Sequence, residues 1–271
     1  MPLFRAVRAA SALGRRLEDL RRAAAVGLAC AVVAGCDLVP SPDPPSFELI
    51  GCLSAAGAST AAFPPVVPSV APWLAAFPGL GATVDAQLSG IAAHTAATFA
   101  VQPSIRYYDD GSAPNAFASS YRTEGRPDGS VRLGVNLVAS EVRRFVTTEQ
   151  TMQRQYSYSV TAILAHELAH IVQVKQGVAT PGKATELQAD FLAGWYLSVL
   201  AQSDPNFRLS SGLEDGIRAF YSRGDYDFNS PHHHGTHDER AAAFLAGFRT
   251  GAPSISAAWT ASMAFRAGLR G

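Results

Sequence analysis

The five residues His166-Glu167-Leu168-Ala169-His170 set two histidines four positions apart, with a glutamate directly after the first. Positions i and i+4 lie one turn apart on the same face of an α-helix, so both imidazoles can reach a single ion. Glu167 then lies beside that ion and not on it. Two histidines that hold Zn²⁺, next to a glutamate that takes a proton from the water activated by the metal, form an arrangement suited to hydrolysis of a peptide bond.

The sequence around this motif has the pattern of a buried helix. Apolar residues recur there at helical spacing, at Val160, Ile163, Leu164, Leu168, Ile171 and Val172. Upstream, Thr147 and Gln150 have the spacing of a capping box, and Gly177 is suited to end the helix. The motif therefore predicts a metal-dependent peptidase. The simpler alternative is a core helix whose two histidines are hydrogen-bonded within the protein.

A third zinc ligand is predicted further along the chain, because catalytic zinc sites usually have three protein ligands and a water. Glu186 is the best candidate, since it begins a second predicted helix, about residues 185–201, which a short connector would fold back against the first. Asp190 lies one turn further on the same face, where it can accept a hydrogen bond from the ring of a ligand histidine. The alternative is that Glu186 is a solvated helix residue.

The composition limits the partners of this chain. It has 271 residues, enough for one domain of about 200 residues and a leader. Its formal net charge is zero, so it lacks the basic footprint of a nucleic-acid-binding protein, and we expect no nucleic-acid partner.

Residues 1–36 have the parts of an export signal. An arginine-rich region precedes an apolar run, Ala23 to Gly35, that is too short to span a membrane comfortably. The run ends in Val33-Ala34-Gly35-Cys36, which resembles the lipobox of bacterial lipoproteins, where the cysteine is lipidated and becomes the new N-terminus. The alternatives are an ordinary cleaved signal, an uncleaved anchor, and a Cys36–Cys52 disulfide that would exclude lipidation.

This resemblance implies a lipoprotein signal peptide over residues 1–36. It also implies attachment through Cys36 to the lipid bilayer of the bacterial cell envelope, with the protein facing the periplasm or another extracytoplasmic space. Whether the membrane is the inner or the outer one stays open.

The remaining chain is predicted to form a proline-rich tether at 37–46 and one domain at 47–271. Its fold class is predicted as α+β, mostly helical, with a small antiparallel sheet preceding the helix that carries the two histidines. Strands are expected at 104–108, 115–121 and 131–137, where Val131, Leu133, Val135 and Leu137 alternate. Helices are expected at 80–99, 185–201, 216–221, 238–248 and 254–268.

Four blocks of the sequence resemble the gluzincin metallopeptidases. They are His166–His170, the run from Glu186 to Trp195 that begins Glu186-Leu187-Gln188-Ala189-Asp190, the run His234-Gly235-Thr236-His237-Asp238-Glu239-Arg240, and Asn115-Ala116-Phe117-Ala118. Within that group they are most similar to the bacterial putative neutral zinc metallopeptidases and the Oma/Ste24-like peptidases. The resemblance covers about residues 104–248 and implies a zincin-like fold.

The resemblance also implies roles for individual residues. Glu167 would be the general base, and the edge strand with Asn115 and Ala116 would hold an extended peptide by backbone pairing. His234 and Arg240 are candidate donors to the oxyanion, and Arg240 is also a candidate for support of the ligands. Three more histidines crowd the same region, at His232, His233 and His237, so the imidazole that enters the site is not decided.

The leading prediction is a lipid-anchored metalloendopeptidase with one Zn²⁺ per chain, held by His166, His170 and Glu186. Its expected substrates are peptides or unfolded proteins of the cell envelope. One alternative is a catalytically idle zinc-binding envelope lipoprotein that acts as a binder or chaperone. Another is an aminopeptidase.

Overall fold

The computed structural model describes residues 49–50, 63–146, 158–178, 182–203, 209–226 and 234–269. The chain divides into two units, and all of these residues belong to the unit Ser46–Gly271. Outside them lie the predicted signal peptide with Cys36, the tether, Cys52, the capping box of Thr147 and Gln150, and the histidines at 232 and 233. Within the described ranges, we find no helix with the length and apolar character needed to cross a membrane.

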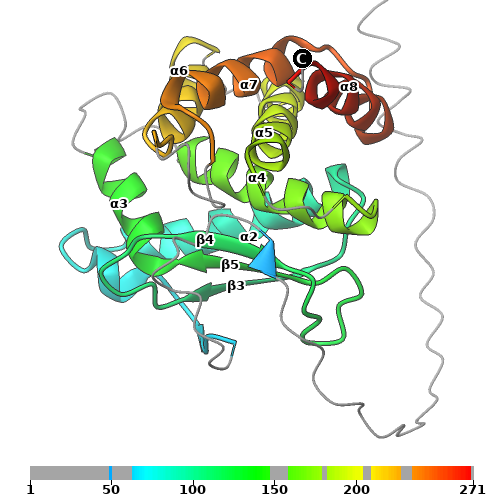
Figure 1. Ribbon diagram of the computed structural model, residues 1–271. Coiled ribbons are helices and arrows are strands. Elements are labelled where there is room, and N and C mark those ends of the chain that lie inside the picture. Colours follow the sequence, from blue (N-terminus) through cyan, green and yellow to red (C-terminus); the bar gives the residue numbers. More distant parts are fainter. Residues whose placement is uncertain are drawn as a thin grey trace, which may run out of the picture. The chain divides into compact units, whose positions relative to one another are not determined.

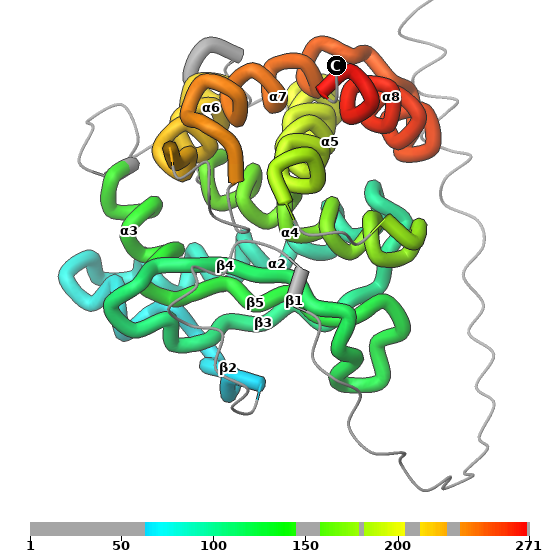
Figure 2. The backbone as a smooth tube through the Cα atoms, viewed as in Figure 1, coloured from blue at the N-terminus to red at the C-terminus, as the bar shows by residue number. Residues whose placement is uncertain are grey.

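The strands form one sheet, with the order β1-β4-β5-β3-β2. They are β1 (Leu49–Ile50), β2 (Val66–Val67), β3 (Ser104–Tyr108), β4 (Ala116–Ser119) and β5 (Ser130–Gly134). Figure 2 shows β2 beside β3 at one edge of this sheet.

The prediction of a purely antiparallel sheet is wrong at one ladder. β3 and β5 are parallel, whereas the other neighbouring pairs are antiparallel. The chain reverses direction twice between β3 and β5, and β5 inserts between β4 and β3. Two reversals restore the original direction, so the sheet is mixed.

The helices make up most of the described unit. They are the 3-10 helix η1 (Ala71–Leu74), α2 (Leu80–Thr98), α3 (Val135–Val146), α4 (Tyr158–Lys175), α5 (Lys183–Ser203), α6 (Leu209–Tyr221), α7 (His237–Arg249) and α8 (Ile255–Gly268). In Figure 1, α2 and α4 lie against the sheet, and α5 to α8 lie beyond α4. The α+β class is therefore confirmed, with a small sheet whose strands all precede α4 in the sequence.

The predicted strand at 131–137 is wrong after Gly134, where α3 begins. Asp110 explains the change: its carboxylate accepts hydrogen bonds from the backbone N–H groups of Asn136 and Leu137, at 2.8 and 3.0 Å. These N–H groups belong to the first turn of α3, where no helical carbonyl can satisfy them. The alternation of apolar residues continues into α3, but a cap from a distant residue ends the strand.

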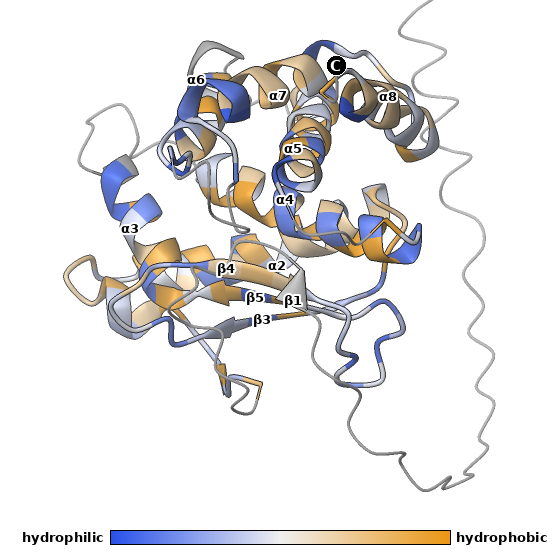
Figure 3. Cartoon of the chain, in the orientation of Figure 1, coloured by the Kyte–Doolittle hydropathy of each residue, from blue (hydrophilic) through white to orange (hydrophobic). Residues whose placement is uncertain are grey.

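The helix that carries the two histidines is buried on every side, as the sequence predicts. Each residue of α4 from Tyr158 to Gln173 is buried, between the sheet and the upper helices. Hydrophobic residues, orange in Figure 3, gather on α4 and on α2 below it. Gly177 ends the helix with φ of 72°, and Val178 donates its N–H to the carbonyl of Gln173 at 2.8 Å, which is the Schellman arrangement.

Two glycines let α5 and α7 approach closely. A Cβ atom on Gly194 would lie 1.9 Å from the carbonyl oxygen of Phe244, and one on Gly247 would lie 1.7 Å from that of Phe191. A larger residue has no room at either position unless the helices separate. This contact brings the start of α7, which carries Arg240, against the part of α5 that carries Glu186 and Asp190.

Candidate metal centre

The two histidines of α4 point to one place. Their Nε2 atoms lie 3.0 Å apart, and both side chains are buried. The i, i+4 spacing on a regular helix produces this meeting, as the sequence predicts.

Glu186 joins the pair from α5. Its carboxylate oxygens lie 3.3 Å from Nε2 of His166 and 3.5 Å from Nε2 of His170. The three residues offer ligand atoms that all lie within 4.8 Å of one another. The predicted ligand set of His166, His170 and Glu186 therefore comes together as a cluster that could hold a metal ion, and Glu186 is not a solvated helix residue.

Asp190 lies against the side of the His166 ring that faces away from the cluster. Its Oδ1 lies 2.8 Å from Nδ1 of His166. A carboxylate only accepts hydrogen bonds, so Nδ1 carries the proton and Nε2 keeps its lone pair for an ion. This is the contact predicted for Asp190 from its position one turn after Glu186.

Arg240 holds Asp190 in turn. Its Nε and Nη2 donate to the two carboxylate oxygens at 2.8 and 2.7 Å, and its Nη1 donates to the carbonyl of Arg223 at 3.2 Å. The guanidinium is buried and donates to these acceptors, and its role as an oxyanion donor stays a prediction. Its predicted role in support of the ligands agrees with this geometry.

His170 has a different partner, Gln173, which was not among the predicted site residues. Nδ1 of His170 lies 2.7 Å from Oε1 of Gln173, one turn further along α4. The signal in the sequence was a polar residue at i+3 on a helix otherwise buried and apolar. Gln188 and Arg266, which lie behind Gln173, gave no signal, because their contacts join helices far apart in the sequence.

Glu167 lies in the same buried region, with 1% of its surface exposed. Among the described residues, its Oε2 has no hydrogen-bond partner. Burial raises the pKa of Glu167 and the charge of Glu186 adds to this, while His166, His170 and Arg240 oppose it. A buried carboxylate oxygen without a protein partner, beside two imidazoles and a second carboxylate, fits a site that also holds a metal and a water.

The two carboxylates of α5 are kept ionised by their neighbours. Burial alone would raise both pKa values. The imidazoles of His170 and His166 outweigh burial and hold the pKa of Glu186 well below its usual value. Arg240, with a contribution from His166, does the same for Asp190. Negative charge is thus available on the side of the cluster that would face a cation.

His234 lies near the cluster and beside Asp225. Its Nδ1 lies 3.3 Å from Oδ2 of Asp225, which also accepts the backbone N–H of His234 at 3.0 Å. Burial lowers the pKa of His234, and although the charges of Glu186 and Asp225 oppose this, the net shift is downward. A neutral ring that donates from Nδ1 to Asp225 presents Nε2 as an acceptor, so His234 would need a second proton to donate to an oxyanion.

The other candidates of this region lie elsewhere. Nδ1 of His237 contacts the carbonyl oxygen of Tyr221, and its ring packs between Tyr221 and Tyr226, with centroids at 5.2 and 5.1 Å. Thr236 caps α7 and forms a capping box with Glu239. The part of the block His234–Arg240 that begins at Thr236 therefore starts α7. This helix brings Arg240 to the cluster.

Asn115 and Ala116 lie at the start of β4, which is not an edge strand, so that prediction is wrong as stated. β1 pairs with Ser119 and Ala118 on the outer side of β4. That ladder is two residues long and does not reach Asn115 or Ala116. Their proposed contact with substrate is therefore confined to the first half of β4.

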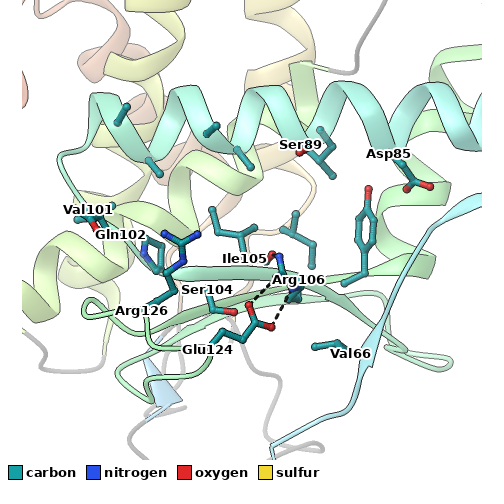
Figure 4. A pocket seen from close by; sticks show the side chains of 18 of the residues that line it. Val66, Asp85, Ser89, Val101, Gln102, Ser104, Ile105, Arg106, Glu124 and Arg126 are labelled. Atoms are coloured by element: carbon teal, nitrogen blue, oxygen red, sulfur yellow. Dashed lines mark hydrogen bonds and ion pairs between the residues drawn. The ribbon is translucent and has the colours of Figure 1, made fainter. Parts of the chain in front are cut away.

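A large cavity of the described unit lies away from the metal cluster. It has a volume of about 1040 Å³ and lies between α2 and β3, as Figure 4 shows. None of the ligand residues lines it. Two of its charged residues have partners within the unit: Arg106 pairs with Glu124 at 2.7 Å, and Asp85 accepts from Ser69 and from the N–H of Val70.

No family model matches the chain, and no curated protein or solved structure matches it.

Proposed function

We propose that this protein is a zinc-dependent metallopeptidase. The observation that carries the proposal is the convergence of His166 Nε2, His170 Nε2 and the Glu186 carboxylate beside Glu167, whose Oε2 has no partner among the described residues. Zinc binding alone needs the three ligands. Burial of a further glutamate next to them costs free energy that zinc binding does not require, and this supports an enzyme.

The donor set supports Zn²⁺ as the ion, with one per chain. Two neutral imidazoles and one carboxylate are a common ligand set of catalytic zinc. Both histidines offer Nε2, because both Nδ1 atoms face acceptors. Zinc, when bound, supplies a Lewis acid that lowers the pKa of water towards about 7.

The residues of this chain then have distinct tasks. Glu167 takes the proton of the attacking water and returns it to the leaving amine. His234 and the first half of β4, with Asn115 and Ala116, are proposed to contact the peptide. Asp190 and Arg240 keep His166 in the tautomer that leaves Nε2 unprotonated.

The proposed substrates are peptides or unfolded proteins of the cell envelope. This part of the proposal rests on the leader at 1–36 and its resemblance to a lipobox, with Cys36 as the lipidated residue. The zincin-like fold is likewise a proposal, supported by the order of the motif blocks and by the placement of α4 against a small sheet.

The substitution Glu167→Gln tests the proposal. It keeps the size of the side chain but removes the base, so we expect hydrolysis of a denatured protein to fall by about 10²–10⁴-fold. Zinc content should not change, because the three ligands remain. The measurement compares both proteins at equal zinc occupancy, with the metal-chelated wild type as a control.

The competing candidate is an idle zinc-binding lipoprotein. The deep burial of all three ligands and of Glu167 is the observation in its favour, because substrate must reach the ion. Equal activity of wild type and Glu167→Gln would show that Glu167 is not the base. A wild type that binds zinc but cleaves nothing across a broad panel of unfolded proteins would favour the idle protein.

A further inference from the structure

We infer that Gln173, Gln188 and Arg266 position His170 for the metal, and that α8 thereby controls zinc affinity. We call these three residues the amide relay. The inference rests on the proposed metal centre but not on catalysis. It assigns a task to the C-terminal helix, which carries no predicted ligand.

The relay is a continuous chain of hydrogen bonds from α8 to α4. Arg266 Nη1 donates to Oε1 of Gln188 at 3.0 Å. Gln173 Nε2 donates to the same oxygen at 3.2 Å and to the carbonyl of Thr185 at 2.8 Å. Oε1 of Gln173 then lies 2.7 Å from Nδ1 of His170.

The direction of every bond follows from groups that have one role. A guanidinium only donates, so the atom of Gln188 that faces Arg266 is its oxygen. That oxygen and the carbonyl of Thr185 only accept, so both require the NH₂ group of Gln173. The oxygen of Gln173 is left to face His170, which must then carry its proton on Nδ1.

The tautomer of His170 decides whether it can bind a metal. With the proton on Nδ1, the lone pair of Nε2 faces His166 and Glu186. If Gln173 were turned over, its NH₂ would face Nδ1 and favour the proton on Nε2, which excludes a cation there. The relay therefore selects the tautomer that binds zinc.

Burial makes this selection strong. The side chains of His170, Gln173 and Gln188 are fully buried, and Arg266 is 6% exposed. Gln188 is also anchored through its Nε2, which donates to Ser262 of α8 at 3.0 Å. An amide that turned over here would leave several buried polar atoms without partners, at about 1–3 kcal/mol each.

Each ligand histidine is thus held by a buried arginine from a different C-terminal helix. Arg240 of α7 acts on His166 through a carboxylate, and Arg266 of α8 acts on His170 through two amides. The amide path sets the tautomer without adding a negative charge beside the cation.

Zinc affinity of the purified protein, from competition with a chromophoric chelator, tests the relay. Gln173→Met is nearly isosteric and removes the acceptor, so its zinc affinity should fall by about 10–100-fold. Arg266→Met should lose less, and Arg266→Lys, which still only donates, should retain more than Arg266→Met. The absorption spectrum of the Co²⁺-substituted protein should change in the same order.

Phe265→Leu is the matched control. Phe265 lies beside Arg266 on α8 and packs on Phe191 of α5, with ring centroids 5.2 Å apart. The change loosens the same contact of helices but leaves the relay intact, so zinc affinity should stay that of the wild type. If Phe265→Leu weakens zinc as much as Arg266→Met, the relay acts only as packing and the inference is overturned.

Two further results would count against the inference. A folded Gln173→Met with wild-type affinity overturns it and leaves the proposed peptidase standing. If Gln173→Met does not fold, equal zinc affinities of Arg266→Met and Arg266→Lys overturn the inference.

Results on the wild type separate the inference from the proposals on which it rests. A wild type without zinc affinity refutes the metal centre itself, whereas a wild type that binds zinc and cleaves nothing refutes only the peptidase.

Discussion

At the scale of single residues, Asp190 contacts both a predicted ligand, His166, and a buried arginine, Arg240. Its Oδ1 lies 2.8 Å from Nδ1 of His166, and its two oxygens accept hydrogen bonds from the guanidinium of Arg240. All three side chains are buried, so the loss of either Asp190 or Arg240 would leave the other charge buried and unpaired. The stability of the site and its metal chemistry therefore depend on the same carboxylate.

We predict that Asp190→Ala weakens zinc binding by about 10–100-fold. It should also lower the free energy of unfolding by about 3–5 kcal/mol, because Arg240 would stay buried without a counter-charge. Chelator competition measures the first effect, and urea unfolding of the metal-free protein measures the second.

The double variant Asp190→Leu, Arg240→Met separates these effects. It should recover much of the stability, since it removes the buried charge, but not the zinc affinity, since His166 still lacks its acceptor. Recovery of zinc affinity as well would mean that Asp190 acts through packing and not through the imidazole.

At the scale of secondary-structure elements, the start of α3 depends on one side chain from another loop. Asp110 accepts the N–H groups of Asn115, Asn136 and Leu137. Gly134 leaves the space for it, because a Cβ atom there would lie 2.0 Å from the Asp110 carboxylate. The junction between β5 and α3 is therefore built around a carboxylate that precedes it by more than 20 residues.

We predict that Asp110→Ala lowers the free energy of unfolding by at least about 2 kcal/mol, the upper range for a lost helix cap, because three N–H groups lose their acceptor together. Asp109→Ala is the control. Asp109 is exposed and caps only the N–H of Gly111 among the described contacts, so its loss should stay within about 0.5 kcal/mol. Equal losses in urea unfolding would contradict the assigned cap.

At the scale of the whole described unit, the packing of α5 against α7 determines whether the cluster can form. Gly194 and Gly247 allow the two backbones to touch. At that separation Arg240 reaches Asp190 from another helix. This contact joins residues 50 positions apart, so it could not be predicted from their spacing in the sequence.

We predict that Gly247→Ala destabilises the protein by about 1–3 kcal/mol and also weakens zinc binding, because the helices must separate and Arg240 moves away from Asp190. Gly90→Ala in α2 is the matched control. A Cβ there meets no atom within 4 Å, so the change should stabilise by up to about 1 kcal/mol and leave zinc affinity unchanged. Thermal unfolding measures the stability, and chelator competition measures the zinc affinity. Unchanged zinc affinity in Gly247→Ala would mean that the metal centre does not depend on the contact of α5 with α7.

The sequence by itself determined the features that repeat at short range. The i, i+4 spacing of His166 and His170 and the apolar period around them predicted a buried helix with two converging imidazoles. The same rule places Asp190 on the face of Glu186, because one turn separates them, whereas Glu186 itself was predicted from the short connector between the two helices. These inferences succeeded because helix geometry alone relates residues three or four positions apart.

Only the tertiary structure decided the features that depend on long-range contacts. The pairing of β3 with β5 and the start of α3 at Val135 each contradict an expectation from local pattern. The contact of Arg240 with Asp190 joins two helices and follows from no local pattern. The amide relay from Arg266 to His170 was not foreseen at all. A buried polar group must find its partner wherever the packing of helices brings one, and that partner's place in the sequence is not constrained by any local period.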